Sequence, residues 1–317
     1  MLAMERFDYS EATGKIIPRK IAEALMNVTD ETLLYGRIEA AVSAESVIAI
    51  IKPANTIPNA NNSEQNIVSI IGRFHEAGWR TVGVKGVPGN ALTLARLAAH
   101  YPRPFSDASI ADLRAALPKA EKTRLATLWG PDATAWPLLH PVQLGQNTPL
   151  QYPEIARLWH AGRGVNNDLL DVGSPEGINT ISPVEDPIYG KRRLLRIKHH
   201  PNVNSGRPFF IVNGFTAEII SKFTRDQEKI AVLLLERQNA GHDIAYLRKH
   251  IIGTTVPKKA KPGSIRYDAL RPHEYRGSYP VTSLETVGIE NNIIHMSDSP
   301  QEATHEVALW MPEFRHA

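Results

Sequence analysis

The chain of 317 residues contains no cysteine. This absence excludes disulfide bonds, thiolate metal sites and a cysteine nucleophile. The sequence also lacks an apolar run close to the ~18 residues that a membrane span needs. Its first residues, Met1 to Asp8, include acidic side chains and no apolar signal core. We therefore expect a cytoplasmic protein without a membrane partner.

An excess of charge of one sign is nearly absent. The 36 Lys and Arg against 33 Asp and Glu give a net charge of +3 and a pI of about 9.0. Such a mild basic excess suits small anions such as nucleotides, but is too small to predict nucleic-acid binding. At 42% hydrophobic and 22% charged residues, the composition is that of a soluble globular protein with one large or two smaller domains.

Hydrophobic periodicity changes several times along the chain. Residues 1–45 carry helical spacing and predict an N-terminal helical extension. Val47–Ile51 is a continuous apolar run, as in a buried strand. Further on we expect helices at 63–77, 92–100, 216–223 and 244–252, and strands at 80–85 and 230–235. Residues 102–206 interrupt this order with a Pro-, Asn- and Gly-rich stretch. Without that stretch, the pattern predicts an α+β fold with helices on one face of a small sheet.

The extension and the interruption each contain shorter segments whose pattern also predicts a helix or a strand. In the extension we expect helices at 20–26 and 31–42, and in the interruption helices near 110–128 and 153–160 and a basic strand at 191–197. Three tryptophans, Trp129, Trp136 and Trp159, predict a small separate core there.

The most informative motif is Asn292-Ile-Ile-His295-Met-Ser297-Asp-Ser299. Ser299 and Glu302 form an S-x-x-E capping box with Pro300 at the first helical position, so a helix should begin directly after the histidine. The backbone amides of a helix start favour anions. A histidine placed here could accept and transfer a phosphoryl group.

Two other elements could meet phosphate. Lys52 follows the first predicted strand in Ile51-Lys52-Pro53, and Lys261-Pro-Gly-Ser-Ile-Arg266 forms a tight turn that aims a guanidinium. A lysine at a strand end or an isolated turn is usually only a surface feature.

These motifs closely resemble the active-site signature of the nucleoside diphosphate kinase family. The resemblance implies a ferredoxin-like antiparallel sheet with helices, and a phosphohistidine on His295 oriented by Glu306. It also implies that Ser297 assists at the leaving oxygen, that Lys52 and Tyr101 act at the phosphate, and that Asn292 binds the sugar. The further nucleotide-binding positions that it implies are Phe209, Lys249, Thr255 and Arg266.

Two segments match the family's Arg-Pro-Phe sequence, whose phenylalanine stacks on the nucleotide base. Arg207-Pro-Phe209-Phe210 places Phe209 as the ring that stacks on a base, and Arg103-Pro-Phe105 competes with it. We prefer Phe209, because a helix and an apolar strand follow it in the family order. A core phenylalanine is the alternative.

The sequence departs from the family pattern at several positions. Lys249 stands where the family has a phosphate-binding arginine, and Arg248 lies beside it. A lysine keeps the positive charge but lacks the planar guanidinium, which can bind a phosphate through two N–H groups at once. Met296 replaces a glycine after the histidine and could crowd a phosphohistidine. Ala54 replaces an acidic residue after the Lys-Pro pair. Residues 102–206 and 267–290 read as insertions beside the base site.

We therefore expect a nucleoside diphosphate kinase-like domain at 46–101 and 207–317, interrupted by the 102–206 insertion. The expected function is transfer of a γ-phosphate to a nucleoside diphosphate, with Mg²⁺ carried by the nucleotide and no dedicated metal site. The resemblance also implies a homo-oligomer. The alternatives are the same chemistry on an unusual nucleotide or other small phosphate, or a non-catalytic nucleotide-binding regulatory module.

Overall fold

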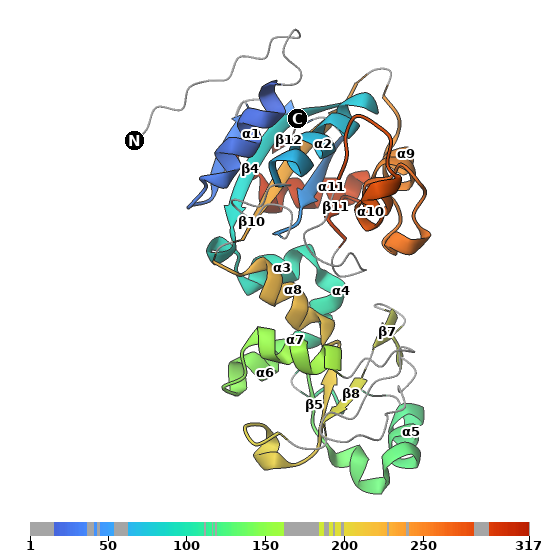
Figure 1. Ribbon diagram of the computed structural model, residues 1–317. Helices are drawn as coiled ribbons and strands as arrows, with labels where there is room; N and C mark the ends of the chain where they lie inside the picture. Colours follow the sequence, from blue (N-terminus) through green and yellow to red (C-terminus); the bar gives the residue numbers. More distant parts are fainter. Residues whose placement is uncertain are drawn as a thin grey trace. The chain divides into compact units, whose positions relative to one another are not determined.

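A computed structural model shows how these segments fold (Figure 1). It describes residues 16–36, 41–42, 45–53, 63–110, 112–115, 117, 119–161, 184–186, 190–192, 194–197, 200–226, 228–238, 241–281 and 292–316. Ala54 and parts of the two expected insertions lie outside these residues. Within the described segments, no helix is long and apolar enough to span a membrane.

The chain forms two compact units. The first comprises residues 1–96 and 222–317, and the second comprises 97–221. The boundaries differ from the expected insertion of 102–206, so that Tyr101 and Phe209 belong to the second unit.

The first unit is built on a five-stranded sheet with the order β1-β4-β10-β3-β11, in which every pairing is antiparallel. Its strands are β1 (Thr32–Gly36), β3 (Ser46–Ile51), β4 (Trp79–Pro88), β10 (Lys229–Arg237) and β11 (Ile294–Met296). Its helices are α1 (Ile16–Met26), α2 (Ser63–Glu76), α9 (Ile244–Tyr246), the π-helix η7 (Leu247–Ile252), α10 (Ile265–Leu270) and α11 (Pro300–Trp310).

Four of these strands follow the ferredoxin-like pattern. Along the chain, β3, α2 and β4 form one strand–helix–strand group, and β10, the helical segment 244–270 and β11 form the other. In space, β10 lies between β4 and β3, and β11 lies on the outer side of β3. This order is that of the split βαβ arrangement. The predicted α+β, ferredoxin-like fold is confirmed, and the second unit enters between β4 and β10.

Both faces of this sheet are covered, although the sequence predicted helices on one face only. Val47, Ala49 and Ile51 of β3 join a core that includes residues of α1 and α2. Ile48 and Ile50 point to the opposite face and are equally buried. Helix α11 packs against β3 there, which explains why the run is continuously apolar.

The N-terminal extension is only partly helical. Helix α1 confirms the first expected helix, but the segment expected to be a second helix contains β1 and the short strand β2 (Ala41–Val42). Strand β1 pairs with β4, and β2 pairs in parallel with β12 (Arg315–His316). Pairing with an open sheet edge outweighs the weak helical spacing of Thr32–Tyr35, whose Thr and Tyr also favour strands.

The second unit has its own core, as its tryptophans predicted. Strand β9 (Phe209–Val212) pairs with β5 (Leu138–Leu139) and β8 (Leu194–Ile197). Residues of α5 (Lys119–Trp129), α6 (Pro141–Asn147), α7 (Tyr152–Ala161) and α8 (Phe215–Phe223) pack with this sheet. The unit also contains most of α3 (Leu94–His100), α4 (Pro102–Phe105) and the hairpin of β6 (Val184–Asp186) and β7 (Gly190–Arg192). Trp159 is fully buried, and Trp129 and Trp136 pack on Phe210.

Candidate active site

His295 lies in the middle of β11, opposite Ile50 of β3. Side chains alternate along a strand, so Ile294 and Met296 point into the core that β3 shares with α2, and His295 points to the other face. Met296 is buried in that core, with 4% of its surface exposed. Its side chain is therefore directed away from the imidazole, and the expected crowding of His295 by Met296 is wrong.

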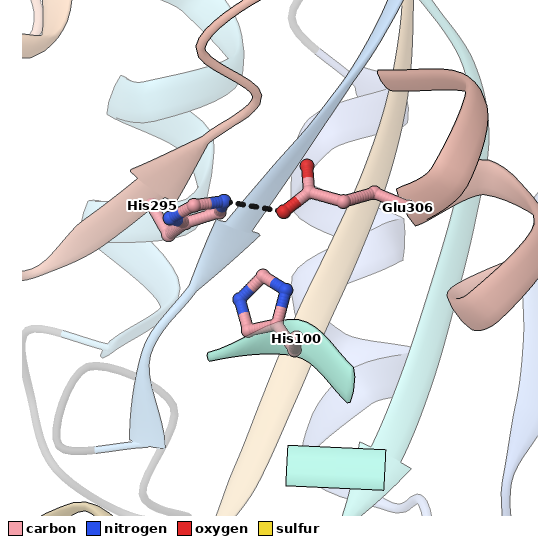
Figure 2. Close-up of side chains that lie close together, drawn as sticks. All are labelled: His100, His295 and Glu306. Atoms are coloured by element: carbon pink, nitrogen blue, oxygen red, sulfur yellow. Dashed lines mark hydrogen bonds and ion pairs between the residues drawn. The ribbon is translucent and has the colours of Figure 1, made fainter. Parts of the chain in front are cut away.

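One carboxylate connects the motif's histidine and serine. Nε2 of His295 lies 2.6 Å from Oε1 of Glu306 on α11 (Figure 2). The hydroxyl of Ser297 donates to Oε2 of the same carboxylate at 2.6 Å. Because a carboxylate only accepts, Nε2 carries the proton in this pair and Nδ1 has the lone pair. Glu306 is 1% exposed and the imidazole 19%, so the carboxylate is enclosed while the histidine reaches the surface.

Ser297 is an orienting residue in this structure. It is fully buried, and its hydroxyl also accepts from the backbone N–H of Ile48 at 3.1 Å. The expected role at a leaving oxygen required an accessible hydroxyl. The geometry instead has Ser297 anchor Glu306 to strand β3.

Of the two hydrogen bonds that define the predicted capping box at the start of α11, one is present. The Ser299 hydroxyl accepts from the N–H of Glu302 at 3.2 Å, but the Glu302 carboxylate accepts from the N–H of Asp298 instead of that of Ser299. Burial, followed by repulsion from Glu306 and Asp298, raises the pKa of Glu302. Acidic groups thus gather at the turn between His295 and α11.

Arg266 is hydrogen-bonded to the backbone of β11, the strand that carries His295. Its Nη1 donates to the carbonyl of Gly253 at 2.8 Å, and its Nη2 donates to the carbonyl of Ile294 at 2.7 Å. The residue is 8% exposed. The structure therefore places this predicted phosphate ligand where it fixes the backbone next to His295.

Lys52 and Asn292 meet, although 240 positions separate them. The ammonium of Lys52 donates to Oδ1 of Asn292 at 2.6 Å. The N–H of Lys52 also donates to the carbonyl of Ile293, which extends the pairing of β3 with β11. Two predicted nucleotide-binding side chains are thereby brought together at the end of the His295 strand.

The remaining candidates of the first unit lie on its surface. Thr255 and Lys249 are exposed. Arg248, to which the sequence assigned no role, forms an ion pair with Asp298, with Nη2 and Oδ1 2.6 Å apart. Helical periodicity cannot reveal this contact, because it joins a π-helix to the turn between β11 and α11.

The two candidates of the second unit differ in exposure. Tyr101 is half-buried and its ring contacts that of His100 edge-on. Phe209 is fully buried in a core that includes Trp159, Leu195 and Ile197. Stacking on a base needs an exposed ring. The prediction that Phe209 forms the base platform is therefore corrected to the alternative, a core phenylalanine.

Residues 198–315 match the family model described as nucleoside diphosphate kinase. Over these residues the chain is nucleoside diphosphate kinase-like. The matched range contains His295, Glu306, Asn292 and Arg266, while Lys52 and Tyr101 precede it.

Individual nucleoside diphosphate kinases are similar over the same length. A mitochondrial enzyme of Dictyostelium discoideum is 33% identical over 116 residues, which are 37% of this chain and 40% of that protein. Those of Herpetosiphon aurantiacus and Nocardia farcinica are each 33% identical, over 111 and 117 residues, 35% and 37% of this chain. The chain spans 56% and 65% of their lengths.

Among solved structures, the apo cubic crystal form of nucleoside diphosphate kinase from Encephalitozoon cuniculi matches with a TM-score of 0.37 and 16% identity. The match covers 84% of this chain and 88% of that one. The fold of the nucleoside diphosphate kinase-like domain is defined by its strand order, described above.

Proposed function

We propose that the protein is a nucleoside diphosphate kinase-like phosphotransferase that works through a phosphohistidine on His295. The observation that carries this proposal is the 2.6 Å contact between Nε2 of His295 and the buried Glu306 carboxylate. This contact fixes the tautomer and directs the lone pair of Nδ1 to the reacting phosphate.

The reaction has two half-cycles. Nδ1 of His295 attacks the γ-phosphorus of a nucleoside triphosphate, an N–P bond forms, and the bond to the β–γ bridging oxygen breaks. The diphosphate leaves with the electron pair. A terminal phosphate oxygen of a second nucleoside diphosphate then attacks the phosphohistidine, which restores the imidazole. Glu306 stabilises the positive charge that the ring acquires in the first step.

Two side chains at the end of the His295 strand suit this chemistry. Lys52 supplies a positive charge for the moving phosphoryl group, and Asn292, which it contacts, supplies an amide for the sugar hydroxyl. Tyr101 and Thr255 stay as proposed nucleotide contacts.

The three acidic residues that follow His295 already have partners within the protein. Glu306 engages His295 and Ser297, Asp298 engages Arg248, and Glu302 engages the Asp298 amide. We therefore propose that Mg²⁺ is held by phosphate oxygens, where it would neutralise part of their charge.

Initial-rate kinetics with ATP and a panel of nucleoside diphosphates test the function. Parallel lines in double-reciprocal plots and no activity in His295→Ala are expected for a ping-pong enzyme. Activity restricted to one modified nucleotide or other small phosphate would favour the first alternative. Tight nucleotide binding without any transfer would overturn the proposal in favour of a regulatory module. Size-exclusion chromatography with light scattering would test the proposed homo-oligomer.

A further inference from the structure

Arg248 presents a guanidinium at the turn that follows His295. Its Nη2 lies 2.6 Å from Oδ1 of Asp298, and its Nη1 lies 3.5 Å from the carbonyl oxygen of the same residue. The two side chains are 46% and 59% exposed. Ion pairs this exposed contribute little to stability, because water screens the charges and both side chains lose freedom. The pair can therefore open at small cost when a more highly charged anion binds.

The helical turn that carries Arg248 is wider than an α-helix. The N–H of Gly253 donates to the carbonyl of Arg248, five residues earlier, at 3.0 Å, within the π-helix η7. Such a turn holds an additional residue, which changes the side chain that faces a given neighbour. Counting along the sequence selects Lys249, whereas the structure directs Arg248 to the turn after His295.

Arg266, the other guanidinium next to the histidine strand, is less able to move. Both of its terminal nitrogens donate to backbone carbonyls, those of Gly253 and Ile294. Moving it to a ligand would leave two buried acceptors without these donors. Of the two guanidinium groups, Arg248 is the one whose present partner is a solvent-exposed carboxylate.

We infer that Arg248, instead of Lys249, contacts the phosphate groups of the bound nucleotide, and that Asp298 holds the guanidinium until they arrive. This inference rests on the proposed function. A phosphate group carries more negative charge than a carboxylate and accepts two parallel N–H bonds from the guanidinium fork. The exchange from Asp298 to phosphate is therefore favourable, and lysine at position 249 cannot reproduce the fork.

Two measurements on the full chain test the inference. The first is the affinity for ADP with Mg²⁺ by calorimetry, and the second is the rate of labelling by γ-labelled ATP. The variants are Arg248→Ala, Arg248→Lys, Lys249→Ala as the matched neighbour, and Asp298→Asn. Thermal unfolding by circular dichroism establishes that each variant is folded.

Arg248→Ala is expected to weaken ADP binding and slow labelling by about 10- to 100-fold, the effect of one or two lost charge-assisted hydrogen bonds. Arg248→Lys should recover part of this loss, and Lys249→Ala should lose much less. Asp298→Asn should bind ADP as well as the wild type or better, since the competing carboxylate has gone. Equal losses in Arg248→Ala and Lys249→Ala would overturn the inference.

Equal losses in Arg248→Ala and Asp298→Asn would also overturn it, because Arg248 would then act by holding the turn. A wild-type protein that binds ADP without becoming labelled would remove the proposed function, while the ADP affinities of the variants would still decide the role of Arg248. A wild-type protein that neither binds nor becomes labelled would overturn both.

Discussion

The hydroxyl of Ser297 lies 2.6 Å from Oε2 of Glu306, and both side chains are buried. The carboxylate uses its other oxygen for His295, so the hydroxyl determines how the carboxylate meets the imidazole. The serine of the histidine motif is thus connected to His295 through Glu306.

Replacing Ser297 with alanine tests this connection. The change removes the donor to Glu306 and the acceptor of the Ile48 N–H, and should cost about 1–3 kcal/mol of stability. The rate of phosphohistidine formation should fall about tenfold, because the imidazole is held less firmly. Ser299→Ala is the matched control: it removes only a helix cap, costs about 1 kcal/mol, and should leave the labelling rate nearly unchanged. Equal labelling rates in both variants would contradict the orienting role.

Phe209 should behave as a core residue. Phe209→Ala would open a cavity in the core around Trp159 and cost about 3–5 kcal/mol of stability. Phe209→Leu should cost less and leave nucleotide affinity unchanged. Thermal unfolding and ADP titration measure the two effects. A Phe209→Leu protein of normal stability that has lost nucleotide binding would restore the role of a base platform.

The buried pair of Arg73 and Asp268 should be essential for the stability of helix α10, which contains Arg266. Arg73 donates to Asp268 at 2.7 Å and to the carbonyls of Gly263 and Tyr279 at 3.1 Å and 2.5 Å. Arg73→Met would leave a buried carboxylate without its partner and should cost about 3–5 kcal/mol. The double variant Arg73→Met/Asp268→Leu should recover much of that loss in urea unfolding. Additive losses in the double variant would mean that the two side chains do not act as a pair.

Glu31 should make stability depend on acid pH. The hydrogen bond from Arg96 is the largest cause that lowers its pKa from 4.5 to about 2, with Lys85 adding to it and burial opposing it. Because the folded-state pKa is the lower one, the stabilisation is complete above about pH 4.5 and is lost as the pH falls toward 2.

Glu31→Gln should therefore lower the free energy of unfolding at pH 7 by about 1–2 kcal/mol, a value reduced for partial exposure. The difference from the wild type should disappear near pH 2. Glu45→Gln, which removes an exposed partner of Arg237, is the matched control and should show little pH dependence. A difference that persisted unchanged at pH 2 would contradict the account of Glu31.

The sequence predicted the elements that local pattern specifies. The buried run Val47–Ile51, the amphipathic helix from Ser63 and the helix start at Ser299 all formed as expected, because each depends on its own residues. The segment Thr32–Gly36 became a strand because β4 offered an edge, which no local pattern contains. The burial of Phe209 likewise follows from residues distant in sequence, such as Leu144 and Leu195.

Site geometry was predictable only in part. The motif identified His295, the family resemblance added Glu306, and the structure brings the two together. The ion pair of Arg248 with Asp298 depends on a π-helical turn. The hydrogen bonds from Arg266 to backbone carbonyls depend on how the neighbouring loop folds. Neither is encoded in residue spacing.

The most direct test of the central claim is to incubate the protein with γ-labelled ATP and Mg²⁺ beside a His295→Ala variant, and to map the label by proteolysis. The account predicts acid-labile, alkali-stable label on the peptide that contains His295 in the wild type and none in the variant. A wild-type protein that binds ATP but carries no label, or equal labelling of the variant, would contradict it.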